Sequence, residues 1–291
     1  MKFKLCAFAD EAGSSINEQI DALKRNNIYA VELRSIDGKN VFDFTVEDAK
    51  EYARIFKEND IEVWSMGSPI GKVDINVDFD EYLSKVIKFF EICHIFECKR
   101  IRMFSFFNAT NSEEQVIKYL KAMVDAANKE GIKLYHENEK DIYGDHFSRV
   151  EILKREVPRL KFIYDPANYI QVGEDINVPL NKAISFTSYF HIKDCFVSTK
   201  EVVPAGMGDA QIEEMLKRID FDTALTIEPH LKIFSGYQSV DQHELKNKFE
   251  YPSNSVAFDE AVKHLKGILI KLGYKEVHGG FEKWSKLDLA L

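Results

Sequence analysis

Residues 132–145 read IKLYHENEKDIYGD, a short alternating apolar run that ends in the polar cluster His136, Glu137, Asn138 and Glu139. A charge buried at the end of a strand must be paired or bound to a metal. The cluster therefore indicates a polar site rather than an ordinary loop. Three later stretches have the same form: FIYDPAN at 162–168, FHIKD at 190–194 and LTIEPH at 225–230. We interpret the four stretches as strand ends that together assemble one divalent-metal site.

Apolar runs alternate with segments of helical periodicity along the whole chain. The predicted strands are the short apolar runs: 4–9, 29–33, 61–66, 99–104, 132–136, 161–164, 189–193 and 224–227. The predicted helices follow them: one beginning at Ser15, then 45–59, 80–97, 112–130, 147–156, 180–188, 210–218 and 256–272. Ser15 with Glu18, and Ser112 with Gln115, have the spacing of N-terminal caps. Strict alternation with short connections predicts a parallel sheet with right-handed crossovers.

The number of strands distinguishes a closed barrel from an open doubly wound sheet, which is the structural alternative. Eight strand–helix units are the number that closes a (β/α)8 barrel, and such a barrel uses about 250 residues as one unit. No Gly-x-Gly-x-x-Gly motif follows the first strand, as a dinucleotide-binding sheet would suggest. We therefore predict an α/β protein with a single (β/α)8 TIM barrel domain over residues 1–291. The C-terminal tail 274–291 has no predicted element and is expected to pack across the barrel bottom or against a partner.

The net charge and the composition argue against several classes of protein. The net charge is −9 and lysines and arginines form no cluster, which argues against nucleic-acid binding. The most apolar helix-like stretch, 86–96, contains Lys88 and Glu91, so we expect neither a membrane span nor, at the N-terminus, a signal peptide. The four cysteines match no strong zinc or redox motif and are expected in the core, which favours a cytoplasmic enzyme.

The C-terminal ends of the strands hold the active site in a (β/α)8 barrel, whatever the chemistry. Glu137, Asp165, His191 and Glu228 lie at the ends of the last four predicted strands, each about one βα unit from the next. Three carboxylates and an imidazole suit one Mn²⁺, Mg²⁺, Co²⁺ or Zn²⁺ ion with open positions. Such an ion polarises a carbonyl, and a carboxylate oxygen can take a proton from carbon. Glu137 and Glu228, on non-adjacent strands, could approach a sugar from opposite faces.

These four motifs, YHENE, YDPAN, HIKD and IEPH, resemble the xylose-isomerase-like TIM-barrel superfamily. That group includes sugar (phosphate) isomerases and epimerases, inosose dehydratases and endonuclease IV. The resemblance extends over nearly the whole chain, from FADEA at 8–12 to the last helix. It implies that Glu137, Asp165, His191 and Glu228 bind the metal. In ketose 3-epimerases, to which the layout is similar, the two matching glutamates also serve as acid and base.

The chain differs from the ketose 3-epimerase pattern at two positions. Those enzymes tend to carry a His three residues after the strand-6 Asp, where this chain has Asn168, and an Arg after the strand-7 His, for which Val197 is the nearest counterpart. The HIKD motif instead resembles the dehydratase-like members of the superfamily. That resemblance implies that Lys193 faces substrate oxygens and that Asp194 supports it.

Further polar residues lie close to these strand ends. Glu32, at the end of the second strand, is expected to contact substrate or else to pair with Arg34 or Lys72. His230 shares the face of the strand-8 glutamate, and ligand contact and simple exposure are equally open for it. His136 should point out of the barrel by strand alternation. The predicted substrate-binding residues are Lys193, Asn168, Glu32, Asp194 and His230.

The function that fits these features is a metal-dependent sugar or sugar-phosphate isomerase or epimerase acting by proton transfer through an enediolate, with a sugar or cyclitol as substrate. Two alternatives stay open: an inosose-dehydratase-like lyase and a catalytically silent barrel that binds metal or sugar. A phosphodiesterase like endonuclease IV is disfavoured, because its extra zinc-binding histidines have no match at Glu32 and Arg34 of the second strand or near the third. The tail is a candidate interface for a homo-oligomer.

Overall fold

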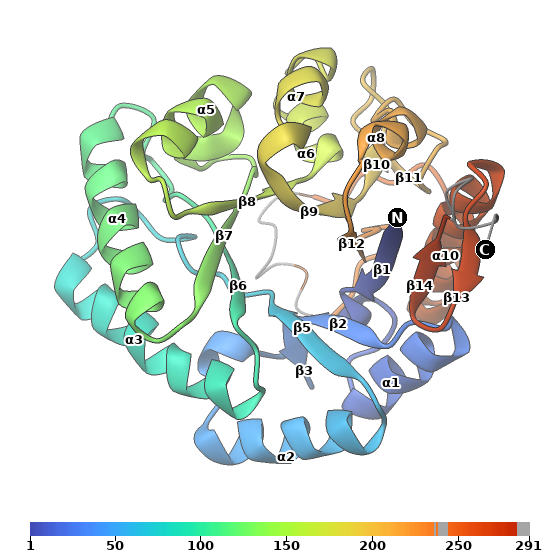
Figure 1. The fold of residues 1–291 in the computed structure, drawn as a ribbon, viewed down its shortest axis with the longest axis horizontal. Helices are drawn as coiled ribbons and strands as arrows, with labels where there is room; N and C mark the ends of the chain where they lie inside the picture. The colour runs from blue at the N-terminus through green and yellow to red at the C-terminus, as the bar shows by residue number, and fades with distance from the viewer. Residues whose placement is uncertain (236, 238–243, 284–291) are drawn as a thin grey trace, which may run out of the picture.

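The barrel is closed by eight parallel strands (Figure 1). The computed structural model describes residues 1–235, 237 and 244–283. Its barrel strands are β1 (Lys2–Ala7), β2 (Ala30–Leu33), β5 (Glu62–Met66), β6 (Arg100–Met103), β7 (Lys133–Glu137), β8 (Lys161–Tyr164), β9 (Thr187–Ile192) and β12 (Thr223–Ile227). They pair in chain order, and β12 returns to β1 with Phe3 opposite Thr223 and Ala7 opposite Ile227. The predicted (β/α)8 barrel is therefore confirmed.

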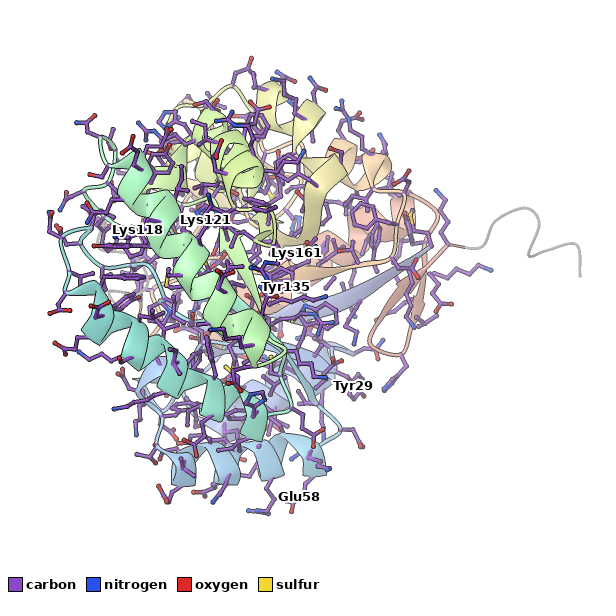
Figure 2. All side chains as sticks on the ribbon, turned by 60° about the vertical axis from the view of Figure 1, so that its left-hand side comes forward. Tyr29, Glu58, Lys118, Lys121, Tyr135 and Lys161 are labelled. Carbon is purple, nitrogen blue, oxygen red and sulfur yellow. The ribbon has the colours of Figure 1, made fainter. Side chains whose placement is uncertain are left out.

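Helices form a ring outside the strands (Figure 1). They are α1 (Ile16–Arg25), α2 (Val46–Glu58), α3 (Phe79–Ile95), α4 (Glu113–Lys129), α5 (Phe147–Glu156), α6 (Pro166–Gln171), α7 (Asn177–Lys182), α8 (Ile212–Arg218) and α10 (Asn254–Lys271). Figure 2 shows how one of them is oriented: α4 carries Lys118 and Lys121 on its exposed side and buries Val116 and Leu120. No helix in the described part of the chain is long and apolar enough to cross a membrane.

Local chemistry explains where the predictions of helices succeed and fail. Ser15 forms the predicted capping box with Glu18. Ser112 is the N-cap residue of α4, but its side chain makes no cap hydrogen bond. Its backbone, with φ −120° and ψ 35°, lies outside the extended region from which a cap side chain reaches the N3 amide. The predicted helix 180–188 is also wrong at its end, because Thr187 begins β9 and pairs with Phe162 of β8.

The interior of the barrel is filled in layers because inward-facing residues recur every second position along a strand. The lower layer is an aromatic and aliphatic cluster: Tyr135, Ile163, Tyr189 and Ala224, with Trp64 packed against it. Two positions further along three of these strands stand Glu137, Asp165 and His191. A largely hydrophobic layer thus forms the floor on which a buried polar layer rests.

The C-terminal tail is partly structured. Residues of β13 (Lys275–Val277) and β14 (Gly280–Glu282) form a hairpin, and β14 pairs antiparallel with the first half of β1. That half of β1 has a free side because β1 and β2 pair only at Ala7 and Val31. Phe281 of the hairpin is completely buried. The tail therefore extends the barrel sheet up to Glu282, and 284–291 lie outside the described residues.

Shorter strands occur in the loops. The pair β3 (Ser35–Ile36) and β4 (Lys39–Asn40) follows β2, and the pair β10 (Asp194–Cys195) and β11 (Val202–Val203) follows β9. Both pairs stand at the C-terminal ends of barrel strands. They give the loops around the predicted site their own hydrogen-bonded framework.

Candidate metal centre

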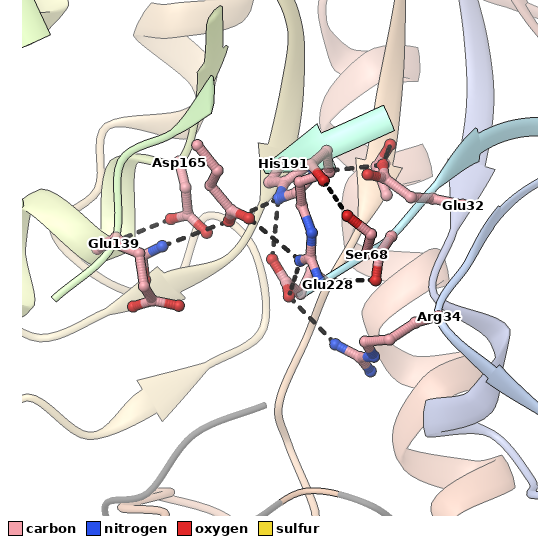
Figure 3. A network of polar contacts seen from close by, with 12 residues as sticks. Glu32, Arg34, Ser68, Glu139, Asp165, His191 and Glu228 are labelled. Atoms are coloured by element: carbon pink, nitrogen blue, oxygen red, sulfur yellow. Dashed lines mark hydrogen bonds and ion pairs between the residues drawn. The ribbon is translucent and has the colours of Figure 1, made fainter. Parts of the chain in front are cut away.

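The structure brings the four predicted metal ligands together at the C-terminal mouth of the barrel. Glu137 ends β7, Asp165 directly follows β8 and caps α6, His191 lies in β9, and Glu228 directly follows β12. All four are buried, and one ligand atom from each lies within 4.8 Å of the others. Figure 3 shows Asp165, His191 and Glu228 converging from their separate strands.

His191 lies at the centre of this group. Its Nδ1 atom is 2.8 Å from Glu137 Oε1 and 3.0 Å from Glu228 Oε2, and its Nε2 atom is 3.2 Å from Glu32 Oε2. Burial by itself lowers the pKa of His191, but Glu137, Glu32 and Glu228 together raise it well above its ordinary value. The imidazolium thus supplies positive charge to the carboxylates, which a metal ion held by the same residues would also supply.

Glu32 binds His191 from below. Its carboxylate also accepts hydrogen bonds from Tyr189 Oη at 2.9 Å and Thr226 Oγ1 at 3.0 Å, and its side chain is completely buried. The pairing of Glu32 with Arg34 or Lys72, predicted as the alternative to substrate contact, is wrong. Arg34 pairs with Asp10, Glu11 and Glu228, and Lys72 pairs with Glu139. A carboxylate that receives the second N–H of a metal-binding histidine fixes its tautomer and orientation. Glu32 is placed for that role.

Lys193 reaches the carboxylates from the end of β9. Its Nζ atom is 2.9 Å from Asp165 Oδ2 and 3.8 Å from Glu228 Oε2, and the residue is 2% exposed. Burial raises the pKa of Asp165 to about 7, even though the ammonium group of Lys193 acts in the opposite direction. Lys193 therefore places a positive charge beside one of the proposed metal ligands and offsets part of the cost of its burial.

Asn168 and Asp194, two of the predicted substrate-binding residues, have structural partners. The backbone N–H of Asn168 donates to Asp165 Oδ1 at 3.0 Å, and its amide donates to the carbonyl of Asn138 at 2.8 Å. The carboxylate of Asp194 accepts from three backbone N–H groups in the following loop, at 2.8–3.1 Å. These hydrogen bonds hold Asp194 to the loop 206–210 and not to Lys193.

Arg102 is a member of the site that the sequence analysis missed. Its Nη1 atom is 3.1 Å from Glu137 Oε2 and 3.6 Å from Glu228 Oε1, and the residue is 3% exposed. It was detectable in principle: an arginine in the short strand RIRM must find an anion if its side chain is buried in the barrel interior. Arg102 thus contacts both glutamates that are predicted to move protons.

A second group of donors lies next to the first and shares Glu228 with it. Glu11, Glu228 and His230 are buried, with ligand atoms within 4.8 Å of one another. His230 Nε2 is 3.4 Å from Glu11 Oε1 and 3.6 Å from Glu228 Oε1, and the residue is buried, so simple exposure is wrong for His230 and ligand contact stays a prediction. Arg34 also enters this group, at 3.3 Å from both Glu11 and Glu228. Burial raises the pKa of Glu11 to about 8, despite Arg34.

The donor set fits a divalent ion. Its members are hard carboxylate oxygens and one imidazole nitrogen, which suit Mn²⁺, Mg²⁺, Co²⁺ or Zn²⁺. Asp165 Oδ2 and Glu228 Oε2 are buried and face cations, Lys193 Nζ at 2.9 Å and His191 Nδ1 at 3.0 Å. Buried carboxylates need such a positive charge beside them, and a bound divalent ion would also supply it. A cavity of about 760 Å³, whose lining includes His230, Gln171 and Lys200, lies over this end of the barrel.

His136 lies outside the metal cluster, on the other face of β7. Its Nε2 atom is 2.9 Å from Ser105 Oγ, and the same hydroxyl accepts the N–H of Gly144 at 2.7 Å. Burial lowers the pKa of His136 to about 3, because the imidazolium would have to leave water. The neutral ring therefore ties the β7–α5 loop to the barrel.

Acid is expected to destabilise the protein through His136. Its pKa is about 3 when folded and 6.5 ordinarily, so the unfolded chain binds more protons between these values. The free energy of unfolding should then fall by about 1.4 kcal/mol per pH unit as the pH drops through this window. Urea unfolding of wild type and of His136→Gln, each at pH 7 and at pH 5, measures how the free energy of unfolding of each protein changes with pH. The difference between these two slopes is the contribution of His136. Equal slopes would show that protonation of His136 is not linked to unfolding.

Comparison with known proteins places the chain among barrels of one family. The family model described as "Xylose isomerase-like TIM barrel" matches residues 20–246. Similar solved structures include an IOLI protein with a bound zinc atom, at 15% identity over 92% of this chain and 99% of that one, with a TM-score of 0.70. A D-allulose 3-epimerase from Methylomonas sp. has 15% identity, coverage of 93% and 98%, and a TM-score of 0.69.

The probable 3-DHS dehydratase AsbF from Bacillus anthracis has 15% identity, coverage of 91% and 99%, and a TM-score of 0.68. No curated protein sequence matches the chain. At such identities the likeness to solved structures shows the fold alone, whereas the family model covers most of the chain. The chain belongs to the xylose isomerase-like TIM barrel family.

Proposed function

We propose that this protein is a metal-dependent isomerase or epimerase that acts on a sugar, a sugar phosphate or a cyclitol. The observation that carries the proposal is the convergence of Glu137, Asp165, His191 and Glu228 within 4.8 Å at the mouth of the barrel. Relatives in fold named as an allulose 3-epimerase and as a zinc-binding protein support the class of chemistry.

The four proposed ligands would hold the metal, and residues around them would keep them in position. A divalent ion held by Glu137, Asp165, His191 and Glu228 supplies Lewis-acid polarisation of a substrate carbonyl. Glu32, which contacts His191 Nε2, keeps the other ring nitrogen directed at the carboxylates. The lower aromatic layer excludes water from beneath the reacting groups and so strengthens their electrostatic interactions.

Glu137 and Glu228 are the proposed acid and base. One carboxylate takes the proton from the carbon beside the carbonyl, and the electron pair of the broken C–H bond moves into the enediolate. The other carboxyl then returns a proton to the opposite face of the same carbon, which gives the epimer. Return to the neighbouring carbon, with the hydroxyl proton passing from one enediolate oxygen to the other, gives the isomer. Arg102, within 3.6 Å of both residues, faces the negative charge as it passes between them.

A lyase is the second candidate, and the placement of Lys193 favours it. Its ammonium group lies beside Asp165 in the buried layer, where it can face substrate oxygens. In an elimination, a glutamate removes the proton next to the carbonyl, while the ammonium group of Lys193 faces the oxygens on which negative charge develops. The hydroxyl on the following carbon then leaves as water, taking a proton from the paired acid, and a C=C bond forms.

Solvent deuterium separates these candidates from a silent binding barrel. We expect Mn²⁺-loaded protein in D₂O to place deuterium at a carbon next to the carbonyl in at least one of a panel of ketoses, their phosphates and inososes. Nuclear magnetic resonance of the recovered sugar detects the exchange. Loss of water with formation of a conjugated enone would instead identify the lyase. No exchange with any member, despite bound metal, would reject proton transfer and favour the silent barrel.

A further inference from the structure

The two donor groups around Glu228 differ in the kind of cation that they hold. The first group, described above as the candidate metal centre, contains the ammonium group of Lys193. The second group, Glu11, Glu228 and His230, contains the guanidinium group of Arg34. Figure 3 shows the contact between Arg34 and Glu228. By ligand type alone, the two groups could hold two metal ions bridged by Glu228.

Arg34 is fixed in its place by contacts on every side. Its Nε and Nη2 atoms each lie 2.9 Å from one oxygen of Asp10, a bidentate pair. Its guanidinium carbon lies 4.4 Å from the ring centre of Phe8 and 4.6 Å from that of Phe234. Asp10 is itself held by Ser35 Oγ at 2.8 Å. The side chain is 1% exposed, and any movement would break the Asp10 fork.

Lys193 is held much less firmly. Its ammonium group is a compact charge at the end of a flexible four-carbon stem, and its closest carboxylate contact is with one oxygen of Asp165, at 2.9 Å. Rotation of the stem can carry that charge away from Asp165 when a metal ion arrives. A rotation of this kind is not open to Arg34, because its planar group is matched to Asp10 and covered by two rings.

We propose that Arg34 permanently takes the place of a second metal ion, so that the protein binds one divalent ion and not two. The inference rests on the proposed metal centre and adds to it the role of the neighbouring site. Glu228 is then a shared carboxylate. Its Oε1 atom faces Arg34 at 3.3 Å, and its Oε2 atom lies on the side of His191 and Lys193. Arg34 acts through Glu228 and is a positioning residue.

A gain of metal by an Arg34 variant tests the proposal. Apo-protein is titrated with Mn²⁺, bound metal is counted after dialysis, and electron paramagnetic resonance distinguishes isolated from carboxylate-bridged Mn²⁺. We expect one isolated ion in wild type and two coupled ions in Arg34→Met, whereas Arg34→Lys, which keeps the charge but loses the bidentate fork, should bind the second ion more weakly than Arg34→Met. Adding Glu11→Gln to Arg34→Met should restore one ion. A merely structural role of Arg34 predicts no gain.

The outcomes distinguish this inference from the proposed function. One ion in both wild type and a folded Arg34→Met overturns the role of Arg34 alone. Two ions in wild type also overturn it, whereas no ion in wild type overturns the metal centre together with it. If Arg34→Met does not fold, Glu11→Gln alone decides. It should still bind one ion, and loss of an ion would show that the second group already held one.

Discussion

Glu137→Gln is expected to abolish carbon–proton exchange while the barrel stays folded. Glutamine keeps the shape and can still hydrogen-bond His191, but it neither accepts a proton from carbon nor binds a divalent ion strongly. General acid–base catalysis contributes about 10²–10⁴-fold to a rate, so we expect a loss of about 10³-fold or more. Deuterium incorporation by metal-loaded protein, with bound metal counted in the same samples, measures it.

Glu139→Gln is the matched control for Glu137→Gln. Glu139 lies two residues further on, is 9% exposed, and its carboxylate is 3.3 Å from Lys72 rather than in the donor group. The same substitution there should change the exchange rate by less than about tenfold, which corresponds to 1.4 kcal/mol. An active Glu137→Gln variant would remove Glu137 from the role of base, whatever the control shows.

Lys193→Met is expected to lower the free energy of unfolding of the metal-free protein and to raise its affinity for a divalent ion. Removing the ammonium group leaves Asp165 and Glu228 buried beside each other without their shared cation. Loss of one partner of a buried ion pair costs about 3–5 kcal/mol. A divalent ion relieves the same repulsion without first displacing a lysine, so its affinity should rise by about tenfold or more, or 1.4 kcal/mol per factor of ten.

Thermal unfolding with and without Mn²⁺ measures both effects of Lys193→Met, since a ligand that binds only the folded state stabilises it according to its affinity. The control is Lys72→Met, which removes a lysine whose ammonium group lies 4.4 Å from the ring centre of Phe104 and beside Glu139. Lys72→Met should leave Mn²⁺ affinity unchanged. Equal Mn²⁺ affinities of Lys193→Met and wild type would mean that the lysine and the metal do not compete.

The sequence predicted the barrel well because its decisive signals are local. Alternating apolar runs locate the strands, and eight of them close the barrel. The period of two along each strand then directs Glu137 and His191 to the same interior. The strands of the tail were harder to predict, because β14 is three residues long and is stabilised by β1, which is distant in sequence. The end of the helix predicted at 180–188 failed for a similar reason, since pairing with β8 determines where β9 begins.

The ion pairs of the site were less predictable than its positions. Arg34 was expected to pair with a carboxylate on its own strand, but its partners come from the loop after β1 and the end of β12. Glu32 and Arg34 are two residues apart and yet bind in different layers, one below His191 and one beside Glu228. Partner choice depends on three-dimensional distances that spacing along one strand does not encode. Arg102 was overlooked because its two glutamates also come from other strands.

The hairpin of β13 and β14 covers an edge through which the barrel sheet could pair with another chain. Strand edges with free N–H and C=O groups are templates for pairing with another molecule. The hairpin covers the open side of β1 and substitutes its own outer edge, β13. That edge is only three residues long and begins with the exposed charges of Lys275 and Glu276. A chain shortened to end at Gly273 would present β1 uncovered and so be prone to aggregate through its sheet.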